Sequence, residues 1–116
     1  MKIEGTGLEA KEATLLELDH ATEELGFVRW AWDYSKATYD LKYDDRQTKE
    51  RYYLRVPAES IKGQVHDDGH RDSMLKLGTP YIGRYTHPHG MDYEYDFPKH
   101  ILDHAKKVLS TLSSSI

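Results

Sequence analysis

Three runs of alternating apolar and polar residues between Phe27 and Val56 constrain the fold of this chain more than any other feature. Alternation with period two is typical of half-buried strands, because successive side chains of a strand point to opposite faces. Aromatic and β-branched residues suit such a pleated surface. The apolar positions are Val28, Trp30, Trp32 and Tyr34, then Tyr39, Leu41 and Tyr43, then Tyr52, Leu54 and Val56. The pattern predicts an antiparallel meander with one apolar and one charged face.

The pairing of the second and third runs follows from their faces and charges. Because the apolar faces must coincide, an odd-numbered residue of one run opposes an even-numbered residue of the other. The register that avoids opposed like charges places Asp40 opposite Arg55. It pairs Tyr39 with Val56, Leu41 with Leu54 and Tyr43 with Tyr52. We expect its charged face, which carries Asp40, Lys42, Tyr53 and Arg55, to be exposed to solvent.

Two amphipathic helices are predicted, at about 14–25 and 97–112. Thr14 and Glu17 have the spacing of a capping box at the start of the first helix. Gly26 follows this helix and can take the left-handed conformation that ends it. The second helix has Pro98 in its first turn. Its apolar stripe consists of Ile101, Ala105, Val108 and Leu112.

Shorter strands are expected after the meander, at 60–66, 71–77 and 81–86, and Pro57 is expected to end the third strand. Two such helices and five or six strands predict a single α+β domain over residues 1–116. It has two layers, an antiparallel meander sheet with both helices packed on one face. The predicted core includes Leu18, Leu25, Trp30, Leu41, Leu54, Leu75, Ile101, Ala105 and Val108.

Composition narrows the function classes. The formal net charge is -4, which argues against a nucleic-acid groove, because such grooves are basic. There is no cysteine, so disulfides and thiolate chemistry are excluded. No apolar run approaches the roughly 20 residues of a membrane span, and no leader pattern opens the chain. We therefore expect a cytoplasmic protein that contacts neither membranes nor nucleic acids.

Several short phrases resemble a known family. They are LGF at 25–27, WDY at 32–34, RYYLRVP at 51–57 and LGTPYI at 77–82, after a leucine-rich acidic helix. Together they resemble the YugN-like family of small bacterial proteins, over a span from about Leu8 to Met91. The resemblance implies no established activity and no catalytic residues.

Histidines offer the main chemical pattern of the chain, because six of seven follow residue 60: His66, His70, His87, His89, His100 and His104. His87 and His89 have a spacing familiar in metal sites, although Asp92 lies one place too late for the H-x-H-x-D-H pattern. His100 and His104 have the helical spacing of H-E-x-x-H without its glutamate. Surface histidines are the simpler interpretation. The alternative is a metal-binding protein or metal-dependent enzyme that uses the His87/His89 loop.

No complete catalytic pattern accompanies these histidines. The chain has no G-x-S-x-G, no P-loop and no dinucleotide fingerprint, so we expect no cofactor. A charged and aromatic surface is predicted around Arg51, Tyr53 and Arg55, and such residues suit protein contacts. The favoured hypothesis is a non-catalytic interaction or ligand-binding module. Its partner is a second copy, in a homodimer, or an unidentified protein.

Overall fold

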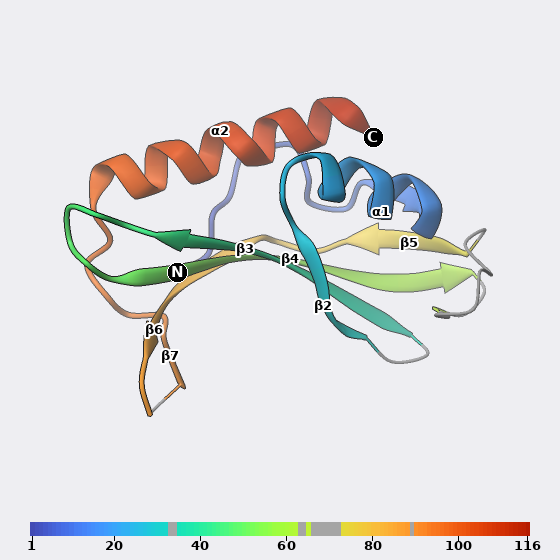
Figure 1. The fold of residues 1–116 in the computed structure, drawn as a ribbon. Coiled ribbons are helices and arrows are strands. Elements are labelled where there is room, and N and C mark those ends of the chain that lie inside the picture. The colour runs from blue at the N-terminus through green and yellow to red at the C-terminus, as the bar shows by residue number, and fades with distance from the viewer. Residues whose placement is uncertain (33–34, 63–64, 66–72, 89) are drawn as a thin grey trace.

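The computed structural model describes residues 1–32, 35–62, 65, 73–88 and 90–116, with the side chains of residues 30–32 excepted. Two helices lie on one face of an antiparallel sheet (Figure 1). The elements are β1 (Glu12–Thr14), α1 (Leu15–Glu24), β2 (Val28–Trp32), β3 (Lys36–Asp44), β4 (Arg51–Lys62), β5 (Met74–Leu77), β6 (Tyr81–Thr86), β7 (Gly90–Asp92) and α2 (Lys99–Ser115). The predicted two-layer α+β fold is confirmed.

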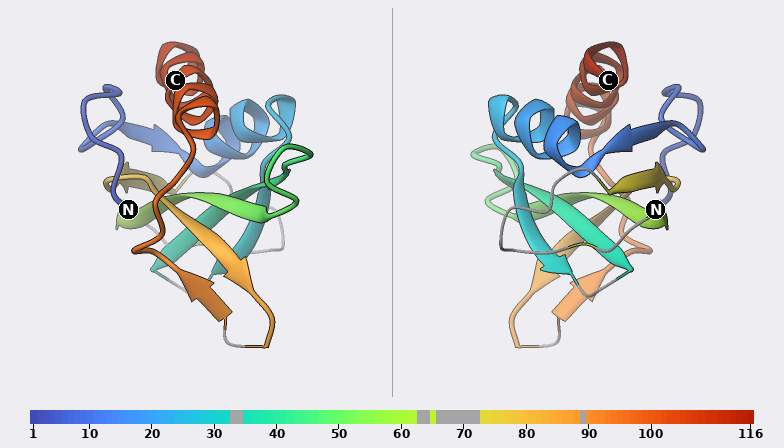
Figure 2. Two further views of the ribbon diagram at one scale, coloured as in Figure 1. Left: turned by 90° about the vertical axis from the view of Figure 1, so that its left-hand side faces the viewer. Right: turned by 90° about the vertical axis from the view of Figure 1, so that its right-hand side faces the viewer.

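The sheet is built around β4. Its strand order is β1-β5-β4-β3-β2, while β6 also pairs with β4, and β7 pairs with β6. β5 and β6 occupy the same edge of β4, one after the other, because β5 pairs with residues 58–62 and β6 with residues 52–55. The β6–β7 hairpin projects away from the helices, as both views of Figure 2 show.

The predicted register of the central hairpin is confirmed. Tyr39 pairs with Val56, Leu41 with Leu54, and Tyr43 with Tyr52. Asp40 lies directly opposite Arg55. The even-numbered side chains of β4 from Tyr52 to Ala58 are buried beneath the helices. Its odd-numbered side chains therefore point to the opposite side, which we call the outer face.

Pro57 does not end the third strand, contrary to the prediction, because β4 continues to Lys62. The carbonyl of Pro57 accepts a hydrogen bond from the Gly78 N–H at 2.9 Å. The N–H and C=O of one strand residue point to the same side, so the missing N–H of Pro57 faces the junction between β5 and β6. The ladder is interrupted there, and proline is tolerated at such breaks.

The helix signals at α1 are confirmed. The Thr14 hydroxyl accepts a hydrogen bond from the Glu17 N–H, and the Glu17 carboxylate accepts one from the Thr14 N–H. Gly26 follows with a φ of 91°, in the left-handed region that suits glycine.

The predicted bounds of α2 need correction. Pro98 is its N-cap residue, and the helix runs on to Ser115. The Lys11 ammonium donates to the carbonyl of Ser113, which satisfies one of the carbonyls left open at a helix end. Because Lys11 is far away in the sequence, the pattern of α2 alone could not show this contact.

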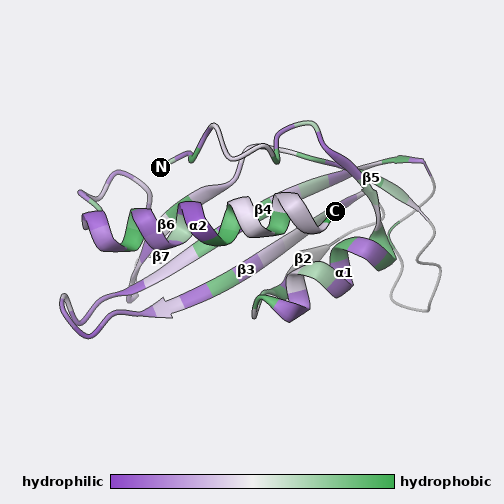
Figure 3. Cartoon of the chain, turned by 90° about the horizontal axis from the view of Figure 1, so that it is seen from above, coloured by the Kyte–Doolittle hydropathy of each residue, from purple (hydrophilic) through white to green (hydrophobic). Residues whose placement is uncertain are grey.

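The core lies between the sheet and the two helices, which sit side by side above it (Figure 3). Five predicted core residues are buried, namely Leu18, Leu54, Leu75, Ile101 and Ala105. Leu25, Leu41 and Val108 are only partly buried against this core. The side chain of Trp30 lies outside the described part. Ile3 and Leu8, which were not predicted, are also buried because the N-terminal segment packs back on the fold.

Val28 was assigned to the apolar face and is instead 65% exposed. A register shift interrupts the β2–β3 pairing between Arg29 and Ala31. Val28 consequently lies opposite Asp40, on the outer face. Strict alternation along β2 could not reveal this irregularity.

Candidate functional site

The residues predicted to form a binding surface, Arg51, Tyr53 and Arg55, occupy alternate positions of β4 on the outer face. Their partners across the hairpin are Asp44, Lys42 and Asp40, in that order. On the other side, β6 brings Gly83 opposite Tyr53 and Tyr81 opposite Arg55. The outer face is thus a grid of charged and aromatic residues from three strands.

Hydrogen bonds to Asp40 and Tyr93, both within the described residues, hold the Arg55 side chain in place. Its Nε donates to both carboxylate oxygens of Asp40, at 3.1 and 3.2 Å. Its Nη1 donates to the Tyr93 hydroxyl at 2.9 Å. The prediction that the Asp40–Arg55 pair is exposed is wrong, since the two side chains are only 5% and 15% exposed. Arg55 is therefore a largely buried residue of this surface, and it holds Asp40 and Tyr93 in place.

Burial sets the acidity of Asp40. Loss of hydration raises the pKa of its carboxyl group above the ordinary value, and Arg55 opposes this rise by charge and hydrogen bonding. A carboxylate in this position depends on its guanidinium partner. Removal of Arg55 would leave a buried charge without compensation.

Aromatic rings from the β6–β7 hairpin cover part of the same face. Gly83 has no side chain, and a Cβ atom placed there would lie 2.7 Å from Met91 Cε and 2.8 Å from Tyr93 Cε1. Met91 and Tyr93 can therefore lie directly on the strand. The Tyr93 ring meets that of Tyr81 edge-on, with centroids 5.6 Å apart. Such T-shaped contacts are favourable beyond the area they bury.

A second series of ring contacts runs from Tyr53 on β4 through Tyr85 on β6 to His87. The Tyr53 and Tyr85 centroids are 6.3 Å apart, and the Tyr85 and His87 centroids are also 6.3 Å apart. The Tyr85 hydroxyl lies 3.3 Å from Nδ1 of His87. His87, a residue of the predicted metal loop, thus lies at the margin of the predicted interaction surface.

Arg51 and Lys42 form an exposed charged cluster with Asp44 on this surface. The Nε of Arg51 donates to Asp44 Oδ1 at 2.7 Å, and Lys42 Nζ lies 3.9 Å from Asp44 Oδ2. The hydrogen bond from Arg51 lowers the pKa of Asp44. The side chains of Lys42, Asp44 and Arg51 are 52%, 58% and 43% exposed. This cluster has two cations and one anion, so it carries a net positive charge.

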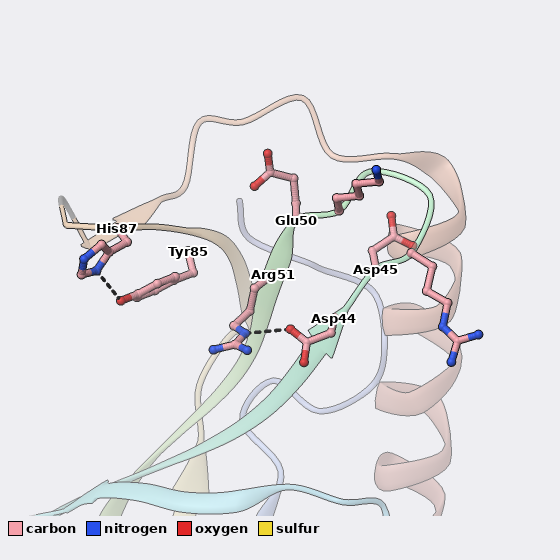
Figure 4. A pocket seen from close by; sticks show the side chains of 8 residues that line it. Asp44, Asp45, Glu50, Arg51, Tyr85 and His87 are labelled. Carbon is pink, nitrogen blue, oxygen red and sulfur yellow. Dashed lines mark hydrogen bonds and ion pairs between the residues drawn. The ribbon is translucent and has the colours of Figure 1, made fainter.

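An open hollow of about 470 Å³ adjoins the cluster (Figure 4). Figure 4 shows the rings of Tyr85 and His87 on one side and Arg51 with Asp44 on the other. Asp45 and Glu50 also border it. Its lining consists of Asp44, Asp45, Arg46, Lys49, Glu50, Arg51, Tyr85 and His87. The acids here are engaged by neighbouring donors, so the hollow lacks the convergent free carboxylates of a cation site.

Among the described residues, no group of three or more histidines, cysteines, aspartates and glutamates could hold a metal ion. His87 contacts Tyr85, while His66, His70 and His89 lie outside the described residues. The two histidines of α2 have separate partners. His100 Nε2 lies 3.0 Å from Asp45 Oδ1, and the His104 ring meets Tyr43 edge-on at 5.1 Å.

Two polar networks near the hollow were not predicted from the sequence. Asp45 Oδ2 accepts from the backbone N–H and hydroxyl of Thr48, at 3.1 and 2.7 Å, which ties the 45–50 loop together. Arg84 donates to Glu50 at 3.3 Å and to Asp92 at 3.4 Å. The partners of Arg84 are distant in the sequence, which hides their contact. Asp45 and Thr48 are only three residues apart, and aspartate commonly forms such local bonds to the backbone.

No helix within the described ranges is both long enough and apolar enough to cross a bilayer.

Comparison with known proteins places this architecture in a family. The model of the YugN-like family matches residues 3–108. The uncharacterized protein YlbA of Bacillus subtilis is 29% identical over 119 residues, which cover 100% of this chain and 95% of YlbA. The uncharacterized protein YugN of the same organism is 28% identical over 80 residues, covering 68% of this chain and 56% of YugN.

A solved structure has the same fold. The crystal structure of the uncharacterized conserved protein YugN from Geobacillus kaustophilus superposes with a TM-score of 0.83 at 39% sequence identity. The match covers 99% of this chain and 93% of that one. The resemblance seen in the short phrases is confirmed, and the chain belongs to the YugN-like family.

Proposed function

We propose that this chain is a non-catalytic, cytoplasmic interaction module that self-associates through the outer face around Arg51, Tyr53 and Arg55. The observation that carries the proposal is the concentration of tyrosines on the side of the sheet opposite the helices. Tyr53, Tyr81, Tyr85 and Tyr93 lie there, and Tyr85 and Tyr93 are among the exposed large hydrophobic side chains. Tyrosine and arginine are enriched at protein interfaces.

The side chains of this surface are also held in fixed positions by contacts within the chain. Arg55 is bound to Asp40 and Tyr93, and Tyr93 is braced by Tyr81. Side chains that are already ordered lose little conformational freedom on binding, which favours affinity. Tyr53 stands beside this braced group, with the Arg55 guanidinium 5.9 Å from its ring centroid.

Replacement of Tyr53 tests the proposal. We expect the wild type to associate with rising concentration in sedimentation velocity, and Tyr53→Glu to stay monomeric because it places a charge at the centre of the contact. Tyr53→Phe keeps the ring and should associate as the wild type does. A wild type that stays monomeric throughout would overturn self-association, as would a Tyr53→Glu protein that associates normally while its thermal unfolding is unchanged.

The alternative is a metal-binding protein that uses His87 and His89. No described contact favours it, since His87 has a tyrosine neighbour and the described residues contain no ligand group. Metal analysis of protein purified without an affinity tag separates the two functions. One equivalent of bound zinc that disappears in His87→Ala and His89→Ala would favour the metal site, whereas we expect no stoichiometric metal.

A further inference from the structure

We propose that copies of this chain associate head to tail, with the acidic face of α1 of one copy docked on the outer sheet face of the next. The inference rests on the proposed self-association and adds its partner surface and symmetry. The two surfaces lie on opposite sides of the molecule, α1 above the sheet and the outer face beneath it (Figures 1 and 2). One copy can therefore use both surfaces at once.

The outer face supplies the positive side of the contact. Lys42 and Arg51 flank the single carboxylate of Asp44, and all three side chains are well exposed. Tyr85 stands next to them with 38% of its surface exposed. The cluster thus offers a positive charge beside an apolar ring, which suits a partner that is both acidic and partly apolar.

The exposed side of α1 has that chemistry. Leu15 to Glu24 contain four acidic residues and neither lysine nor arginine. Leu16, His20, Glu23 and Glu24 are exposed and recur at helical spacing, so they form one outward stripe. Leu16 is 55% exposed. It offers an apolar contact for Tyr85.

A two-fold pairing of outer faces is less favourable. In a two-fold interface the same patch occurs on both sides, and residues near the axis face their own copies. An axis through this part of the sheet brings Lys42 and Arg51 close to the same cations of the other copy. The open edge at β2 is also a poor site for pairing, because its ladder is irregular between Arg29 and Ala31.

Head-to-tail contacts do not close on themselves unless the rotation between copies forms a ring. We therefore expect species larger than a dimer as the concentration of wild type rises. The contact joins exposed charges, so association should weaken as salt shortens the range of their attraction to a few ångströms at about 1 M.

Mixing two variants tests the arrangement directly. Lys42→Glu/Arg51→Glu reverses the sheet cluster, and Glu23→Lys/Glu24→Lys reverses the helix stripe. Each variant alone has only one working surface of the pair and should be monomeric in sedimentation velocity. In their equimolar mixture the intact α1 of one variant meets the intact sheet face of the other, and the two reversed surfaces also carry opposite charges, so the mixture should regain association into species larger than a dimer. Lys107→Glu, on the exposed side of α2, is the control and should associate as the wild type does.

Other results would show whether the self-association or only the head-to-tail contact is wrong. If the helix variant forms wild-type species while the sheet variant is monomeric, the proposed function stands and the head-to-tail contact is overturned. If the wild type is monomeric at every concentration, both are overturned. Circular dichroism verifies folding, and if a charge reversal fails to fold, Arg51→Gln and Glu23→Gln replace it, with the same pattern expected in weaker form.

Discussion

The Asp40–Arg55 pair shows how a residue on an uncovered sheet face can be buried. Asp40 lies opposite Val28 and Arg55 in the pairing of β2, β3 and β4, and Arg55 is capped by the Tyr93 hydroxyl. A charge this deep in the protein is stable only with its partner, because desolvation is expensive. The pair therefore contributes to the order of the surface that the tyrosines share.

Arg55→Ala should lower the free energy of unfolding by about 3 kcal/mol at pH 7, as removal of one partner of a buried ion pair commonly does. The loss should be smaller near pH 4. Burial raises the pKa of Asp40, and without Arg55 it rises further, so the neutral acid forms readily in the folded state. Urea unfolding at the two pH values measures the difference. An equal loss at both would show that Asp40 is not the group left uncompensated.

Asp45 provides a second test at the level of a single carboxyl group. Hydrogen bonds from Thr48, and then from His100, lower its pKa from 3.8 to about 2. A carboxyl group with a lowered folded pKa stabilises the protein above the unfolded value, and this contribution is lost as the pH falls from about 4 towards 2.

Acid titration of wild type and Asp45→Asn checks this expectation. The wild type should lose stability across that pH interval more steeply than the variant, which has no group to titrate at this position. Parallel curves would contradict it. The carbon-13 shift of the Asp45 carboxyl group, followed by NMR, locates the transition independently.

At the level of elements, alternation and capping predicted most of the scaffold. The register of β3 and β4 could be predicted because one face must be apolar and the other must avoid opposed like charges. α1 could be located because Thr14, Glu17 and Gly26 act locally. Pro57 and Val28 were misjudged because their environments depend on strands distant in the sequence, β5 and β6 for Pro57 and the irregular β2–β3 pairing for Val28.

Alanine substitutions of Leu54 and Val28 compare a strand residue that faces the core with one that faces solvent. Leu54 is fully buried, so Leu54→Ala should lower the free energy of unfolding by about 2–5 kcal/mol. Val28 is 65% exposed, so Val28→Ala should lower it by less than about 0.5 kcal/mol. Chemical denaturation of both variants gives the comparison. Similar losses would mean that β2 is paired differently from the register described here.

At the level of the whole molecule, charge is unevenly distributed over the surface. The net charge is negative, yet the exposed outer-face cluster is positive and α1 bears only acidic and neutral residues. Sequence could predict the acidic helix and the position of Arg51, Tyr53 and Arg55 on one face of the sheet. It could not predict that Tyr85, His87 and Tyr93 join them, because only the pairing of β6 with β4 brings these residues to the same face.

The central position of β4 has a consequence for any attempt to divide this protein. The partners of β1 and β3 both come after the 45–50 loop, since β1 pairs with β5 and β3 pairs with β4. A chain cut in that loop would leave an N-terminal piece and a C-terminal piece that each lack strands of the sheet. Neither should fold alone, and together they should rebuild the native sheet. The loop is therefore a natural place to split the protein into two complementing fragments.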